Sequence, residues 1–147
     1  MTQYQPGDII EVRTDRGLVY VHMTHHHESY PPVIRLLAGL HKTRPDDLAA
    51  LVSGEVRLTA MIPLDTALAR LGLSHEKGGQ AELQPAEHRF PTFRMPIRDH
   101  QGQVVYWWFW DGQGLSHASE LDEMQKTLPL REVMSSKQFL DELLRVD

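Results

Sequence analysis

The sequence predicts an α+β domain made mainly of antiparallel strands, arranged as a twisted sheet or partly open barrel with a few short helices and a C-terminal helix. Three observations predict this class. Short runs of β-branched and aromatic residues recur along the chain, separated by clusters of turn residues. Most are joined by hairpin turns or short helical segments rather than by the long helices of a parallel sheet. One clear amphipathic helical pattern closes the chain.

The size and composition of the chain limit its class. Its 147 residues, 41% of them apolar, suit a single domain over residues 1–147 with a substantial core. The absence of cysteine excludes disulfide scaffolds and thiol catalysis, and it is compatible with the reducing cytoplasm, where we expect this protein. No signal-peptide pattern or membrane-length apolar run is present, so no membrane association is predicted. The formal net charge of −5 disfavours nucleic acid as a partner.

The first third of the chain predicts a β-hairpin and a third strand. Two β-rich runs, residues 8–13 and 18–23, flank a turn that ends in Gly17, which is the pattern of a hairpin. Residues 24–32 are polar and end in two prolines, which predicts a loop. A further apolar run over residues 33–39 predicts the third strand.

The middle of the chain alternates short helices with extended segments. Residues 44–52 place aspartates before leucines at helical spacing, which predicts a short helix. Residues 56–63 alternate like a strand, and a second helix begins at Asp65 and ends at Gly72. Residues 74–84 contain two adjacent glycines and few apolar side chains, so we expect an exposed loop there.

The last third predicts a second hairpin and the final helix. Residues 90–97 are extended, and their prolines suit an edge strand, which a turn at residues 99–102 connects to the aromatic run that follows. Residues 128–133 look like another strand. The C-terminal helix has Ser135 or Ser136 as its N-cap, and Phe139, Leu140, Leu143 and Leu144 form its apolar stripe.

The aromatic run contains all three tryptophans and five of the eleven aromatic residues within five consecutive positions. In a strand, side chains alternate between the two faces. One face would carry Tyr106, Trp108 and Trp110, and the other would carry Val105, Trp107 and Phe109. Two interpretations stay open: a core strand covered on both sides, or a tryptophan-rich surface that binds a partner.

Acidic residues follow the aromatic run closely. We predict that Tyr106, Trp108 and Trp110 anchor a protein partner by burial. Exposed carboxylates would add charge complementarity toward a basic partner. These carboxylates are Asp111, Glu120, Asp122 and Glu123.

No motif predicts catalytic residues, a metal site or a cofactor. The segment His25-His26-His27-Glu28 is the most obvious candidate for metal binding. Adjacent residues in an extended segment point to opposite sides, so its three rings do not readily converge on one ion. Neither a dinucleotide fingerprint nor a Walker-type phosphate loop occurs.

Four motifs together resemble a known family. They are Pro6-Gly7-Asp8-Ile9-Ile10 with the Tyr20-bearing strand, Ile62-Pro63-Leu64, Trp107-Trp108-Phe109-Trp110-Asp111-Gly112, and Leu128-Pro129. Their order is similar to that in the twenty-sixth immunity-protein family of bacterial polymorphic toxin systems and its uncharacterised relatives. The resemblance implies a small, β-rich cytoplasmic protein that binds and blocks a cognate toxin domain. It carries over no catalytic residues.

The sequence therefore favours a non-enzymatic binding protein, an immunity-like inhibitor that occludes a basic toxin domain. The first alternative is a small-molecule or metal-dependent enzyme that uses the His25–His27 loop and the aromatic strand. The second alternative is an oligomerising module in which the aromatic face forms a homodimer interface.

Overall fold

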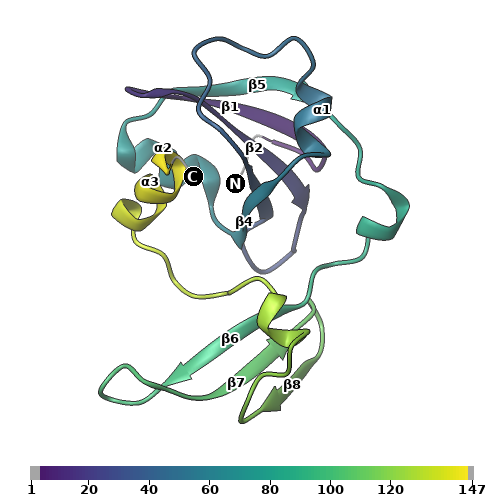
Figure 1. The fold of residues 1–147 in the computed structure, drawn as a ribbon, viewed down its shortest axis with the longest axis vertical. Coiled ribbons are helices and arrows are strands. Elements are labelled where there is room, and N and C mark those ends of the chain that lie inside the picture. Colours follow the sequence, from purple (N-terminus) through teal and green to yellow (C-terminus); the bar gives the residue numbers. More distant parts are fainter. Residues whose placement is uncertain (1–3, 146–147) are drawn as a thin grey trace. The chain divides into compact units, whose positions relative to one another are not determined.

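A computed structural model describes residues 4–145 and has an α+β fold with mostly antiparallel strands, which confirms the predicted class. In this part of the chain the strands form a five-stranded and a three-stranded sheet, and neither closes into a barrel (Figure 1). The backbone contacts divide the chain into two compact units. Unit 1 combines residues up to Ala86 with those from Met134 onward, and unit 2 is Glu87–Val133. The single domain expected over residues 1–147 thus contains two units.

Unit 1 is built on the five-stranded sheet, whose order is β4-β3-β2-β1-β5. Its strands are β1 (Asp8–Thr14), β2 (Gly17–His25), β3 (Val33–Leu37), β4 (Val56–Met61) and β5 (His75–Gln80). All neighbours are antiparallel. The predicted hairpin is confirmed, with Ile10 opposite Val21. Its turn requires glycine, because Gly17 has a φ of +137° and an added Cβ would lie 2.9 Å from the His41 carbonyl oxygen.

The sheet of unit 1 is buried on both faces. One face packs against α2 (Leu64–Leu71) and α3 (Ser136–Leu144), where Leu68, Phe139 and Leu143 join the main core. The other face carries a smaller cluster around Ile9, Tyr20, Leu37 and Leu48, which includes α1 (Leu48–Val52). Near-continuous burial along β2 and β3 follows from this two-sided cover.

The three helices of the described residues lie within a few residues of their predicted bounds, although α2 begins at Leu64 rather than at Asp65. Asp47 accepts a hydrogen bond from the Ala50 N–H at the start of α1. Gly72 ends α2 in the left-handed conformation, at a φ of 69°. Ser135, not Ser136, is the N-cap of α3, and it forms a capping box with Gln138. Within residues 4–145, no helix has the length and apolar character needed to cross a membrane.

The prediction of a loop over residues 74–84 is wrong for its first half. Residues 75–80 form β5, an edge strand that pairs with β1. This strand has few apolar side chains, and its pairing is made by the backbone. Its glycines give room to α1, since a Cβ on Gly78 or Gly79 would lie 3.2 or 3.4 Å from Leu48 Cδ1. The residues that suggested flexibility therefore permit close packing.

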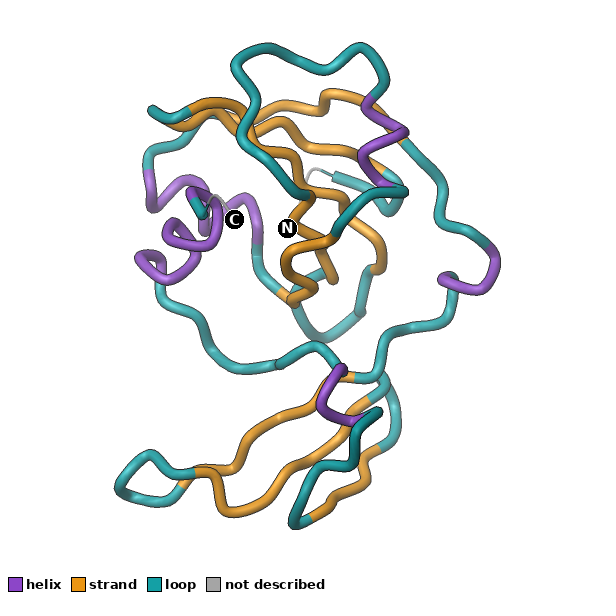
Figure 2. Tube along the Cα trace, viewed as in Figure 1, coloured by secondary structure: helices purple, strands orange, loops and turns teal. Residues whose placement is uncertain are grey.

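Unit 2 is built on a three-stranded antiparallel sheet in the order β6-β7-β8 (Figures 1 and 2). Its strands are β6 (Phe93–Arg98), β7 (Val104–Trp110) and β8 (Leu115–Ala118). The predicted edge strand and the hairpin into the aromatic strand are confirmed as β6 and β7. The sequence missed β8, whose Leu-Ser-His-Ala stretch is short and mostly polar.

Two short 3₁₀ turns, η1 (Pro85–Glu87) and η2 (Gln125–Thr127), are the remaining secondary structure of residues 4–145. The strand predicted over residues 128–133 is wrong, because only an isolated parallel bridge between Arg94 and Leu130 forms there. The Arg94 N–H donates to the Pro129 carbonyl, and the Arg131 N–H donates to the Arg94 carbonyl, both at 2.9 Å. The segment Leu128–Glu132 therefore runs along the outer edge of β6 without extending the sheet.

Candidate functional site

The three-stranded sheet places the aromatic residues of β7 on two faces, as strand alternation predicts. The register sets Met95, Trp108 and His117 side by side across the sheet, and it sets Phe93, Trp110 and Leu115 side by side in the same way. Cross-strand neighbours share a face. We call this side the Trp108 face, defined by Tyr106, Trp108, Trp110, Leu115 and His117.

The middle of the Trp108 face is a cluster of partly exposed rings. The Tyr106 and Trp108 rings meet edge to face, with centroids 6.4 Å apart. The ring of His117, the β8 neighbour of Trp108, lies 5.2 Å from the Trp108 ring, with 54° between the ring planes. Trp108 and Tyr106 are half-buried and His117 is exposed. Contacts between the rings hold them in a defined arrangement while part of each stays in contact with solvent.

Trp110 is on the same face but lies in the interior of unit 2. Its side chain is only 7% exposed. Phe90 packs against it at 5.5 Å and Phe93 at 6.5 Å between ring centroids. The Arg131 guanidinium covers the indole at 4.6 Å from the ring centroid. Trp110, which the sequence grouped with the partner anchors, therefore offers a partner little surface, and its packing holds the unit together.

The opposite face of the sheet is also partly covered by the chain itself. The Arg94 guanidinium lies 5.1 Å from the centroid of the Trp107 ring, and Phe109 is buried. Farther along β7, Val105 is 55% exposed. The aromatic strand thus runs from an exposed end at Val104 to a buried end at Trp110.

The four predicted carboxylates all lie exposed near β8. Asp111 precedes it, and its Oδ1 accepts hydrogen bonds from the Gly114 and Gln113 N–H groups. These bonds hold the pKa of Asp111 below its usual value, so the group stays ionised. After β8, Glu120 is exposed, Asp122 accepts from the Gln125 N–H at η2, and Glu123 pairs with Lys126 at 3.2 Å. Negative charge therefore lies at both ends of this strand.

The sequence missed the role of His117, because it missed the strand that carries it. One local signal for this strand was present in the sequence. Asp111-Gly112-Gln113-Gly114 is a turn sequence directly after a strand, and a second strand is expected after such a turn. Gly112 adopts a φ of +96° there.

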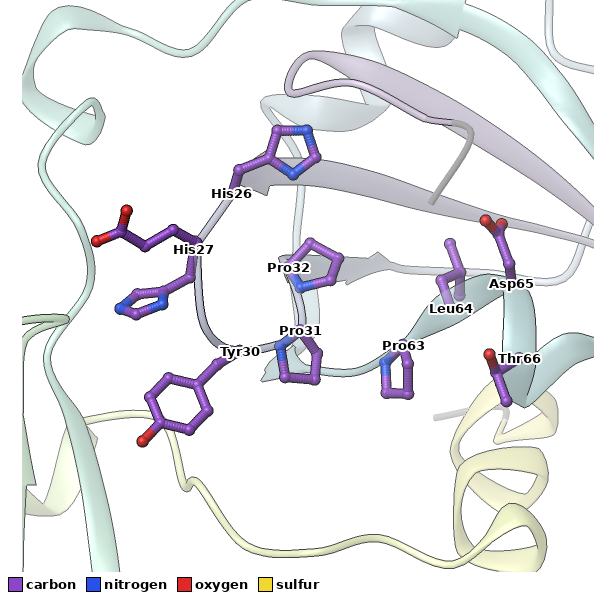
Figure 3. Close-up of a pocket in the computed structure, with 10 residues that line it drawn as sticks. His26, His27, Tyr30, Pro31, Pro32, Pro63, Leu64, Asp65 and Thr66 are labelled. Carbon is purple, nitrogen blue, oxygen red and sulfur yellow. The ribbon is translucent and has the colours of Figure 1, made fainter. Parts of the chain in front are cut away.

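The histidine loop of unit 1 borders an open groove of about 500 Å³. Figure 3 shows His27 and Tyr30 toward one end of this groove, Asp65 and Thr66 toward the other, and three prolines between them. His27 Nδ1 accepts the Ser29 N–H at 3.0 Å, and its ring lies 5.1 Å from that of Tyr30. His25 does not line the groove, and its Nδ1 is hydrogen-bonded to Thr24 Oγ1. Among the described residues, no three His, Asp or Glu side chains gather to hold a metal ion.

A buried ionic network in unit 1 contains the most strongly shifted titrations. Glu11, which is 2% exposed, accepts hydrogen bonds from the Arg44 Nε at 2.7 Å and the Tyr20 hydroxyl at 2.8 Å. The Arg44 bond lowers the pKa of Glu11 despite burial. Burial and Glu11 raise the pKa of Tyr20 to about 12. The carboxylate is thus ionised and the phenol neutral at pH 7, so neither group is ready to exchange a proton, and we assign the network a structural role.

Comparison with protein-family models, with curated proteins and with solved structures gives no match for this chain.

Proposed function

We propose that this chain is a non-enzymatic binding protein that uses the Trp108 face to occlude a protein partner. The partly exposed cluster of Tyr106, Trp108 and His117 carries this proposal. Tryptophan and tyrosine contribute most to the energies of protein interfaces, because large rigid rings bury much area at small entropic cost. Here the rings are held in place by each other before any partner binds.

The surroundings of the cluster support the same function. Leu115 is 60% exposed on the same face. Met124, the N-cap residue of η2, is 79% exposed. Asp111, Glu120, Asp122 and Glu123 add negative charge near β8. Apolar anchors with an acidic rim suit a partner with a basic rim around an apolar patch.

The resemblance of the sequence motifs to immunity proteins makes a toxin domain the partner class that we propose. Inhibition would be by steric occlusion, which requires no catalytic residue and no cofactor. Both proteins would then meet in the bacterial cytoplasm.

Affinity capture from host lysate tests this function. We expect the wild-type protein to retain one stoichiometric partner that a Trp108→Ala variant loses, because truncation of a central interface tryptophan weakens binding by about 2 kcal/mol or more. A Val133→Ser variant is the control, because Val133 is 96% exposed, in unit 2, and outside the cluster. Equal capture by wild type and Trp108→Ala, or no stoichiometric partner in either, would contradict the proposal.

The groove beside His27 and Tyr30 favours one alternative, a small-molecule or metal-dependent enzyme. Its test is metal analysis of protein purified without a tag. Metal retained by wild type and lost in His27→Ala would support this alternative. Absence of metal from the wild-type protein would remove the metal-dependent form of this alternative.

A further inference from the structure

The two edges of the three-stranded sheet differ. The outer edge of β6 is occupied by the chain's own segment Leu128–Glu132, and Pro96 within β6 removes one backbone donor. At the other edge, β8 pairs with β7 alone among the described strands. Residues 115–117 of this edge strand are exposed. An open edge of this kind presents unpaired N–H and C=O groups to another chain.

The hydrogen-bond pattern shows which groups point outward from β8. The Asp111 N–H donates to the Gly114 carbonyl, so these residues form a hydrogen-bonded pair beside the turn. Hydrogen-bonded and non-hydrogen-bonded pairs alternate along an antiparallel ladder. Phe109 and Ser116 therefore form a hydrogen-bonded pair, whereas the backbone groups of Leu115 and His117 point away from β7. The outward hydrogen bonds of Arg94, the β6 neighbour of Phe109, fit the same alternation.

The charges around β8 indicate what kind of strand would fit. In an antiparallel pair of two copies of β8, the outward-facing residues Leu115 and His117 would pair with each other. The end at Asp111 of one copy would then lie beside the end at Glu120, Asp122 and Glu123 of the other. Acidic groups would then face acidic groups at both ends, which opposes self-pairing. A strand with basic residues at its ends would instead meet Asp111 on one side and Glu120, Asp122 and Glu123 on the other.

We propose that β8 binds an extended segment of the protein partner as a fourth strand of this sheet, and that the segment has alternating apolar residues with basic residues at both ends. This inference rests on the proposed function. The added strand would hydrogen-bond to Leu115 and His117, and alternate side chains would lie beside the His117 and Leu115 side chains on the Trp108 face. Backbone pairing would give affinity, and the aromatic cluster would select the side chains.

A synthetic peptide, Lys-Lys-Val-Thr-Val-Thr-Val-Lys-Lys, is the probe that tests the edge. We expect saturable binding by tryptophan fluorescence and slower hydrogen exchange at the Leu115 and His117 amides. A peptide with glutamate in place of lysine should bind at least about tenfold more weakly, and so should His117→Pro, which loses one outward donor. Should His117→Pro disturb the fold, the lysine peptide N-methylated at alternate residues tests the same bonds without changing the protein.

Any of three results would overturn the proposal. The first is no saturable binding of the lysine peptide, and the second is binding of its N-methylated form as tight as that of the unmodified peptide. The third result is a wild-type dimer in which the Leu115 and His117 amides exchange slowly without peptide. The captured partner separates this inference from the proposed function. Loss of capture in Trp108→Ala but full capture in His117→Pro would leave the binding function standing and remove the strand addition. Capture of no partner by wild type would remove the binding function itself.

Discussion

Unit 1 and unit 2 distribute their apolar side chains in opposite ways. Among the described residues, 22 hydrophobic side chains are buried, and only Phe93, Phe109 and Trp110 of these belong to unit 2. Seven large hydrophobic side chains of residues 4–145 are exposed, and six of them lie in unit 2. The exposed exception in unit 1 is Tyr30. Unit 1 thus covers its apolar surface, whereas unit 2 displays it.

The source of this difference is the number of layers. The sheet of unit 1 has helices and a second cluster to cover its two faces. Unit 2 has three strands, one short 3₁₀ turn and irregular segments, so it covers its tryptophans with single arginines, Arg94 and Arg131, rather than with a helix. A region with so little cover keeps a surface that a partner can complete. We therefore interpret unit 1 as the scaffold and unit 2 as the binding region.

The largest effect on stability within unit 2 is expected for Trp110→Ala. Removal of a buried tryptophan costs about 3–5 kcal/mol, and here Phe90, Phe93 and Arg131 would lose their shared neighbour. Trp108→Ala should cost less, about 1–2 kcal/mol, since that ring is partly exposed. Hydrogen exchange should show faster exchange in β6 and β7 for Trp110→Ala alone. Equal destabilisation by the two variants would contradict the division of the face into an interior and a surface part.

The next largest effect is expected for Glu11→Gln in unit 1, at about 2 kcal/mol, because Arg44 and Tyr20 lose a charged acceptor. The matched change in unit 2 is Glu132→Gln, which breaks an exposed ion pair with Arg98 and should cost less than about 1 kcal/mol. Urea unfolding at pH 7 measures both. A larger loss of unfolding free energy for Glu132→Gln than for Glu11→Gln would contradict the expectation that the ionic network of unit 1 contributes more to stability than the ion pair of unit 2.

The Glu11 variant also has a pH signature. The pKa of Glu11 is lowered in the folded protein from an ordinary value of 4.5, so its stabilisation is fully present above that value and is lost as the pH falls through the lowered pKa. Wild type should lose its advantage over Glu11→Gln in this acid range. A difference between the two proteins that stayed constant down to pH 2 would contradict the assigned cause.

Tyr20→Phe should cost about 1–2 kcal/mol, since Glu11 keeps its bond to Arg44 but loses the phenol. The folded pKa of Tyr20 is raised from 10 to about 12, so its stabilisation is present below pH 10 and declines as the pH rises toward 12. Unfolding measured between pH 8 and pH 11 should therefore show a steeper alkaline decline for wild type than for the variant. Parallel declines would argue against a shifted phenol.

A smaller effect is expected at the helix starts. Ser135→Ala removes the capping box of α3 and should cost about 1 kcal/mol of unit 1 stability. Asp122→Ala removes the equivalent bond at the short η2 turn of unit 2 and should cost less than about 0.5 kcal/mol. Thermal unfolding of both variants measures the difference. A greater cost at Asp122 would show that η2 supports its sheet more than its size indicates.

The sequence predicts most elements of the fold because their patterns are local. Hairpin turns, the Asp47 and Ser135 caps and the Gly72 stop each act within a few residues of the element that they define. β5 and β8 were missed for a physical reason. Both are edge strands held mainly by backbone pairing, so their side chains carry no apolar alternation.

The candidate site shows the same limit. Alternation along β7 places Trp108 and Trp110 on one face, as the sequence predicts. It cannot distinguish their burial, because Trp110 is covered by Phe90 and Arg131, which lie some twenty residues away in opposite directions along the chain. Whether a tryptophan of β7 is available to a partner or buried in the core depends on these contacts between residues far apart in the sequence.

The most direct test of the scaffold and binding roles is the affinity of the captured partner for two aromatic variants. Trp108→Ala changes a partly exposed ring of unit 2, and Tyr30→Ala changes an exposed aromatic ring of unit 1. Calorimetric titration should give at least about thirtyfold weaker binding for Trp108→Ala and unchanged binding for Tyr30→Ala. Weaker binding for Tyr30→Ala with unchanged binding for Trp108→Ala would contradict these roles and assign the partner to the groove of unit 1.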